Sequence, residues 1–218
     1  MSTADNKLSS KDATTFKKLV KCYEEKQYKN GLRHAKQILS NSKCSPIHAE
    51  SLAYKGMCLS VIGRAEEALE SVKAAVKTDL KCSLAWRAYA LVLRESKKYE
   101  ESVKCFKNSM KIERNNLDNL RDLSVLQIHL RDLEGWKESR HAIYQIKPTQ
   151  RNLVAVAMSY HLTGDFDTAL NMLDNLNKSK ENVNKELVGE LMKKMFNKKE
   201  AYDYENSELI LYHNMVIR

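Results

Sequence analysis

The chain has 218 residues and a formal net charge of +9, from 37 Lys and Arg against 28 Asp and Glu. Only six glycines and two prolines are present, too few for the many turns of an all-β protein, whereas good helix formers such as Leu, Lys, Glu and Ala are plentiful. This composition predicts an all-α chain that is long enough to bury a sizeable core.

Residues 1–11 are predicted to be an N-terminal tail, because MSTADNKLSS has no apolar run of the kind found in secretory signals. No apolar stretch approaches the roughly 20 residues that a bilayer-spanning helix needs. We therefore expect a soluble, cytoplasmic protein with no membrane contact. The five cysteines never form a C-x-x-C pair, and we interpret them as reduced core thiols: Cys22, Cys44, Cys58, Cys82 and Cys105.

Residues 12–177 contain five nine-residue blocks, each opening on a small residue: GLRHAKQIL, ALESVKAAV, SVKCFKNSM, GWKESRHAI and ALNMLDNLN. Their first residues, Gly31, Ala68, Ser102, Gly135 and Ala169, lie 37, 34, 33 and 34 positions apart. Twelve positions before each lies Leu19, Gly56, Ala90, Leu123 or Ala157. This pattern, with short turns between, predicts five repeats of two antiparallel helices.

The small residues are predicted to lie where the two helices of a repeat cross most closely. Gly135 takes this position in the fourth repeat, and Trp136 takes the next one, which elsewhere is Leu32, Leu69, Val103 or Leu170. Glycine inside a helix costs about 1 kcal/mol relative to alanine, a cost that close packing offsets. We therefore interpret Gly135 and Trp136 as packing residues and not as catalytic ones.

The period near 34 and several matching positions resemble the tetratricopeptide (TPR) repeat: Trp86, Ala68, Ala169, Tyr28, Tyr99 and Phe166. This resemblance implies an α-solenoid, a right-handed superhelix whose concave face is lined by the first helix of each repeat. The residues expected there are mostly apolar: Met57, Leu84, Arg87, Leu91, Leu120 and Met158. They are either a protein-binding face or core between repeats, and the sequence leaves both open.

Three segments, KQYKNGLRHAKQILS (26–40), LRDLSVLQIHLRDLEGWKESR (120–140) and YENSELILYHN (204–214), resemble the amino-terminal part of the auxiliary subunit of NatA, the complex that acetylates the N-termini of nascent proteins. This resemblance implies a non-catalytic scaffold in the cytoplasm that binds a separate catalytic acetyltransferase subunit and helps to dock it on the ribosome. A generic TPR adaptor or co-chaperone for another protein or peptide is the alternative.

The last part of the chain departs from the repeat pattern. We interpret residues 178–203 as a charged linker that can hold one short helix, and residues 204–218 as the first helix of a further, truncated repeat. The natural chain is therefore expected to continue beyond Arg218.

No motif points to catalysis by this chain. Acetyl-CoA binding in the partner acetyltransferases uses a Q/R-x-x-G-x-G/A turn, and here no two glycines lie within two residues of each other. The histidines have no convincing metal-ligand spacing, since the loose pair Cys44 and His48 is better explained as a free thiol and a surface imidazole. We expect no catalytic, cofactor-binding or metal-binding residues, no cofactor and no small-molecule substrate.

The basic N-terminal region is the clearest functional signal. Residues 1–45 contain ten Lys and Arg against four Asp and Glu, which suits attraction to the phosphate backbone of ribosomal RNA. Aromatic residues do not alternate with the lysines, so no base readout is expected. The alternative is that these lysines only solvate outer helix faces. The predicted contact residues are Lys7, Lys11, Lys17, Lys18, Lys21, Lys26, Lys29 and Arg33.

Overall fold

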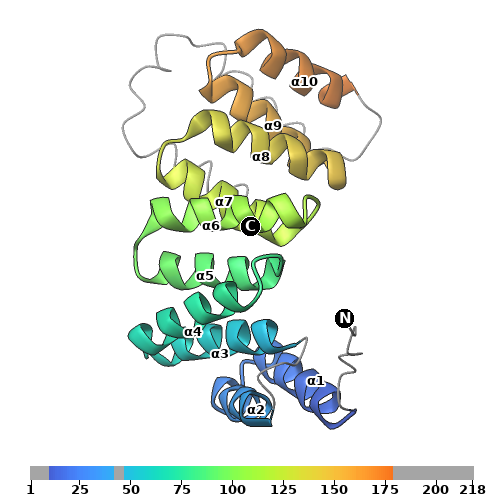
Figure 1. Cartoon of the computed structure of the whole chain (residues 1–218). Coiled ribbons are helices and arrows are strands. Elements are labelled where there is room, and N and C mark those ends of the chain that lie inside the picture. The colour runs from blue at the N-terminus through green and yellow to red at the C-terminus, as the bar shows by residue number, and fades with distance from the viewer. Residues whose placement is uncertain (1–9, 42–46, 179–218) are drawn as a thin grey trace, which may run out of the picture. The chain divides into compact units, whose positions relative to one another are not determined.

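The structure is a computed structural model that describes residues 10–41 and 47–178. These residues form ten α-helices and no β-strand (Figure 1), which confirms the all-α, TPR-like prediction. The helices are α1 (Ser10–Glu24), α2 (Tyr28–Asn41), α3 (His48–Ile62), α4 (Ala65–Thr78), α5 (Ser83–Glu95), α6 (Tyr99–Ile112), α7 (Leu117–His129), α8 (Leu133–Ile146), α9 (Gln150–Leu162) and α10 (Phe166–Lys178). Helix α1 begins inside the predicted tail. Nearly all of the predicted linker and the whole truncated repeat, residues 179–218, lie outside the described residues.

The chain divides into two compact units, Met1–Arg114 and Asn115–Arg218. Helices α1 to α6 belong to the first unit, and α7 to α10 belong to the second. Within each unit the helices pair in chain order as hairpins, because the turn inside each pair is too short for any other arrangement.

The same turn joins the two helices of every pair. One residue in each turn has a left-handed backbone with φ between 58° and 91°: Lys26, Gly63, Lys97, Arg131 and Gly164. The next amide donates to the carbonyl five residues earlier at 2.8–2.9 Å: Gln27 to Cys22, Arg64 to Leu59, Lys98 to Leu93, Asp132 to Gln127, and Asp165 to Tyr160. This is the Schellman pattern, which satisfies carbonyls at the end of the first helix.

The turns correct the register that we predicted for the fourth repeat. Gly31, Ala68, Ser102 and Ala169 each follow the left-handed residue by five positions, whereas the fifth residue after Arg131 is Trp136. Gly135 therefore lies one position before the equivalent site, and Ser124, not Leu123, is equivalent to Ala90. The prediction was wrong because it aligned the smallest available residue, whereas the turn sets the register of both helices.

Small residues allow close helix crossings in the first unit. The hydroxyl of Ser102 on α6 donates to the carbonyl of Ala90 on α5 at 2.7 Å. A Cβ added to Gly56 on α3 would lie 3.1 Å from the carbonyl oxygen of Ala68 on α4. Side chains from α2 to α5 form one buried apolar cluster of this unit, and Leu19, Ala35 and Ile38 of α1 and α2 form a second one.

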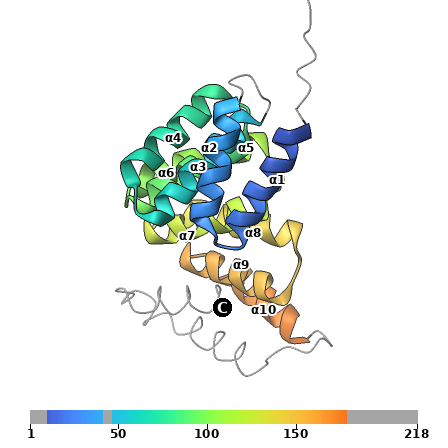
Figure 2. The same cartoon turned by 90° about the horizontal axis from the view of Figure 1, so that it is seen from below.

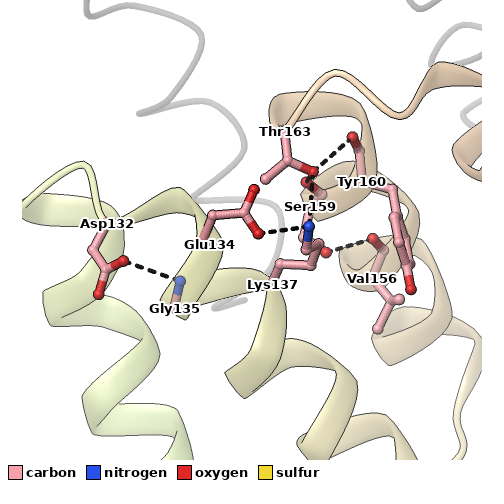
Figure 3. Close-up of polar contacts among 8 residues, drawn as sticks. All are labelled: Asp132, Glu134, Gly135, Lys137, Val156, Ser159, Tyr160 and Thr163. Carbon is pink, nitrogen blue, oxygen red and sulfur yellow. Dashed lines mark hydrogen bonds and ion pairs between the residues drawn. The ribbon is translucent and has the colours of Figure 1, made fainter.

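In the second unit, Trp136 joins its own hairpin to the next one, because Ile128 of α7 also packs against its cluster. Trp136 is buried in this cluster with Ala157 and Met158 of α9 and with Ala169, Leu173 and Leu176 of α10. Gly135 has a local role, because a Cβ there would lie within 3.0 Å of both Asp132 and Gln127. The Asp132 carboxylate caps α8 by accepting from the Gly135 amide at 3.0 Å (Figure 3).

Polar side chains also join α8 to its neighbours in the second unit. The ammonium of Lys137 lies 2.7 Å from the Glu134 carboxylate and 3.5 Å from the hydroxyl of Thr163, the residue that follows α9 (Figure 3). On the side of α7, the buried hydroxyl of Ser139 donates to the side-chain oxygen of Gln127 at 2.7 Å. Neither contact was predicted, because these residues carry no repeat signal.

Candidate functional site

A groove of about 560 Å³ lies between α1 and α2, which run side by side (Figure 2). Its α1 residues share one helix face because they recur every three or four positions. Ser10, Lys11, Thr14, Thr15 and Lys18 line it from α1, and His34 and Gln37 line it from α2. We call this the basic groove.

The basic groove suits an anion. None of its seven lining residues is acidic, and the lysines are exposed. The hydroxyls of Thr14 and Thr15 donate to the carbonyls of Ser10 and Lys11 at 2.8 Å. The side-chain donors that remain for a ligand are therefore the two ammonium groups, the Ser10 hydroxyl, the Gln37 amide and the His34 ring.

His34 responds to this basic environment. Burial lowers its pKa from the ordinary 6.5, and the charges of Arg33 and Lys18 lower it further. Its Nδ1 atom is buried and has no hydrogen-bond partner among the described residues. An anion in the groove would favour the protonated ring.

The predicted contact residues that the structure describes are exposed but do not form one site. Of these seven, only Lys11 and Lys18 line the groove. Lys21 lies 3.7 Å from Glu25, and Lys26 is the left-handed turn residue. Lys17, Lys29 and Arg33 are exposed, and Lys7 lies outside the described residues. We did not predict His34 or Gln37, although His34 follows Arg33 in the basic block GLRHAKQIL.

The predicted concave face separates into two groups. Met57, Leu120 and Met158 are 5%, 1% and 0% exposed. They pack in the cores of their units, so they offer no surface to a partner, and this part of the prediction is corrected. The regular spacing of these apolar residues in the sequence reflects their burial in the core and not a binding surface. The others, Leu84, Arg87 and Leu91, are half-buried at helical spacing on one face of α5.

An aromatic cluster in the first unit lies near Arg87. Its ring centroids are 5.9 Å apart for Phe16 and Tyr54, 5.4 Å for Tyr23 and Tyr54, and 5.8 Å for Tyr23 and Tyr28. Burial raises the pKa of Tyr23 and Tyr54, and the charge of Arg87 acts in the opposite direction on both. Half-buried tyrosines beside an arginine are typical of protein-binding surfaces. The tyrosine face is the name that we give to these residues together: Phe16, Tyr23, Tyr28, Tyr54, Leu84, Arg87 and Leu91.

The remaining reactive groups give little chemistry. The described part of the chain contains no group of three His, Cys, Asp or Glu residues that could hold a metal ion. The four cysteines in this part are free, and burial raises the pKa of Cys58 and Cys105 to about 11. These two thiols are therefore protonated and weakly nucleophilic at neutral pH. None of the helices described here is long and apolar enough to cross a bilayer.

Comparison with known proteins places the chain among auxiliary subunits. A family model described as the Psidin N-terminal TPR repeats region matches residues 16–216. A human relative, "N-alpha-acetyltransferase 16, NatA auxiliary subunit", is 43% identical over 212 residues, which are 97% of this chain and 23% of that protein. An Arabidopsis thaliana relative, "N-terminal acetyltransferase A complex auxiliary subunit NAA15", is 41% identical over 168 residues, 77% of this chain and 18% of that protein.

Solved structures agree with this relationship. "Structure of Naa15/Naa10 bound to HypK-THB" matches with a TM-score of 0.74 and 28% identity over 95% of this chain and 33% of that chain. A MamA structure, with a TM-score of 0.58 and 15% identity over 77% of this chain and 93% of that chain, shares the fold alone.

The chain spans about a quarter of the length of the human relative. The relatives are named auxiliary subunits, which confirms that this chain was correctly predicted not to be the acetyltransferase itself. The match over residues 16–216 shows the family: the chain belongs to the family described as the Psidin N-terminal TPR repeats region, and its relatives at 43% and 41% identity are named NatA auxiliary subunits.

Proposed function

We propose that this chain is the N-terminal repeat segment of a non-catalytic scaffold, which binds the catalytic subunit of a NatA-type acetyltransferase and docks it on the ribosome for cotranslational N-terminal acetylation. The named relatives support the scaffold role, as does the solved complex that contains both Naa15 and Naa10. The protein would act in the cytoplasm, where nascent chains emerge.

The basic groove supports the ribosomal part of this proposal. It places the ammonium groups of Lys11 and Lys18 and the ring of His34 around one groove, and none of the described residues that line it is a carboxylate. Such a groove attracts the phosphate backbone of ribosomal RNA whatever its sequence. This arrangement is the observation that carries the docking role.

The tyrosine face supports the protein-binding part. Tyr23, Tyr54 and Arg87 come from α1, α3 and α5 of one unit, and large amphipathic side chains of this kind contribute much of the energy at interfaces. We propose that this face contacts the acetyltransferase subunit or another chain of the complex.

Sedimentation of the 218-residue chain with purified ribosomes tests the docking role. Binding should weaken steeply with salt. The double reversal Lys11→Glu/Lys18→Glu should weaken it throughout and lower the slope of log K against log salt by about 2, because two phosphate contacts are lost. The control is Lys17→Glu/Lys21→Glu, which changes the charge of the same helix by the same amount outside the groove. Equal losses in the two variants would contradict a groove-specific contact.

A pull-down of the full-length protein tests the scaffold role. The bound fraction should contain an acetyltransferase subunit, and Tyr54→Ala/Arg87→Ala should reduce its recovery if the tyrosine face contributes. Recovery of a different client without any acetyltransferase would support the generic adaptor instead.

A further inference from the structure

The second unit buries a positive charge that has no counter-ion among the described residues. Arg140 on α8 is only 7% exposed. Its guanidinium carbon lies 5.5 Å from the centroid of the Trp136 ring. Its Nε–H has no hydrogen-bond acceptor within the described ranges. A buried guanidinium normally has a carboxylate or several carbonyl partners, because an unpaired buried charge is costly.

A second unsatisfied donor lies beside the first. Trp136 is 3% exposed, and its indole N–H also has no acceptor in the described part of the chain. Residues 136 and 140 are one helical turn apart, so the two side chains occupy the same face of α8. The other tryptophan of the chain differs, because the Trp86 indole donates to the Leu80 carbonyl at 2.9 Å.

The local electrostatics favour an incoming anion. Burial is the main reason that the pKa of Arg140 falls to about 10, and the charge of Arg121 on α7 lowers it further. Arg140 therefore remains charged at neutral pH. Arg121 lies 3.5 Å from Asp118, whose side chain is 62% exposed, so that carboxylate is mostly in water. The region around Arg140 thus combines positive charge, low polarity and two unused N–H groups.

We propose that Arg140 and Trp136 form a binding site for a carboxylate side chain of a protein partner. The carboxylate accepts hydrogen bonds from the guanidinium and from the indole N–H. The guanidinium fork can pair with a carboxylate or a phosphate, and the carboxylate is the better candidate here because it carries a single charge into an apolar site. The apolar surroundings, Ala157, Met158 and Leu173, disfavour a dianion.

A polypeptide is the expected carrier of this group. Removing a carboxylate from water is costly, so a small carboxylate should bind weakly and saturate only at high concentration, whereas apolar contacts made by the rest of a partner strengthen the binding. This site belongs to the second unit and does not depend on the basic groove or on ribosome binding.

Nuclear magnetic resonance of the ¹⁵N-labelled 218-residue chain tests the proposal. The probes are sodium acetate and acetyl-Glu-amide at pH 7 and constant ionic strength, with acetyl-Gln-amide as the neutral counterpart. The Trp136 indole and Arg140 Nε–H signals should shift saturably with both carboxylates and not with acetyl-Gln-amide. The Trp86 indole should not shift, because its donor is already used. No saturable shift at Trp136, or a stronger response to inorganic phosphate, overturns the assignment.

Two variants separate a binding role from a structural one. Arg140→Met keeps the length of the side chain and removes its charge, so the carboxylate response at Trp136 should disappear. Its thermal midpoint should equal or exceed that of the parent chain, because an unpaired buried charge has been removed. Arg140→Lys keeps the charge without the planar fork and should weaken the response several-fold. A lowered midpoint for Arg140→Met with an unchanged response at Trp136 would show that Arg140 is only a packing residue.

Discussion

Single residues in the five turns control how each hairpin closes. Every turn needs one left-handed backbone, and glycine meets this need at Gly63 and Gly164, whereas Lys26, Lys97 and Arg131 adopt the same conformation with a Cβ present. A left-handed backbone costs a non-glycine residue roughly 1–2 kcal/mol. The turn position is therefore strained in three of the five described repeats.

Exchanging residues at this position should change stability in opposite directions. Lys97→Gly should raise the free energy of unfolding by up to about 1 kcal/mol, because it removes the strain of φ 60°. Gly63→Ala should lower it by about 1 kcal/mol through backbone strain alone, because a Cβ there meets nothing within 4 Å. Urea unfolding followed by circular dichroism measures both.

The neighbouring residue is the control for these variants. Lys98 has φ −89°, so Lys98→Gly relieves no left-handed strain, and because glycine is well tolerated at the N-cap of a helix it should change the free energy of unfolding less than Lys97→Gly does. If Lys97→Gly destabilised the chain, the left-handed residue would not be a source of strain.

At the scale of elements, the pairing of α1 with α2 determines the chemistry of the basic groove. His34 lies on α2, and two lysines of the groove lie on α1. Burial lowers the pKa of His34 in the free chain, and the charges of Arg33 and Lys18 lower it further. A bound anion acts in the opposite direction and raises it. Anion binding and protonation of His34 therefore favour each other.

This coupling predicts that affinity for RNA rises as the pH falls from 7.5 to about 5.5. The charge of the phosphodiester backbone is constant over this range, so the group that titrates lies on the protein and not on the RNA backbone. Affinity rises at lower pH because a bound anion raises the pKa of His34, so this ring binds a proton more strongly in the complex than in the free chain. Fluorescence anisotropy with a short RNA duplex measures the affinity at each pH.

A His34→Gln variant isolates the contribution of this ring. It should keep most of the affinity at pH 7.5, where the ring is neutral, and lose much of the rise at lower pH. A rise of the same size in the variant would place the titrating group elsewhere.

At the scale of the whole molecule, stability is distributed locally. Helix contacts within each unit are mainly between neighbours in the chain, as in other repeat proteins, where each repeat depends mostly on the adjacent ones. The first unit contains six helices and its own apolar cluster.

Residues 1–114 should therefore fold alone. This segment should keep a helical circular dichroism spectrum and a cooperative thermal transition, because its core comes from α1 to α5. It should also keep the salt-dependent binding of RNA, because the basic groove is made only by α1 and α2. A segment that is unfolded, or that is folded and no longer binds RNA, would contradict this view.

The sequence by itself determined the helical class and the five hairpins, and the resemblance of three segments indicated the family. A period near 34 residues recurs along the chain, and each hairpin forms through contacts within about that length, so local patterning is sufficient for the hairpins. It also identified Lys11 and Lys18 within a longer basic segment. Conversely, the register of the fourth repeat was misread, because residue size at Gly135 is weaker evidence than the turn geometry at Arg131.

Only the tertiary structure decided which side chains are accessible and which share a site. Met57 and Leu84 look alike in the sequence, yet the first is buried and the second is half-exposed. His34 joins the lysines of α1, and Arg140 becomes a buried charge beside Trp136. Burial and proximity depend on how helices pack against one another, and the intervals between residues along one helix do not contain that information.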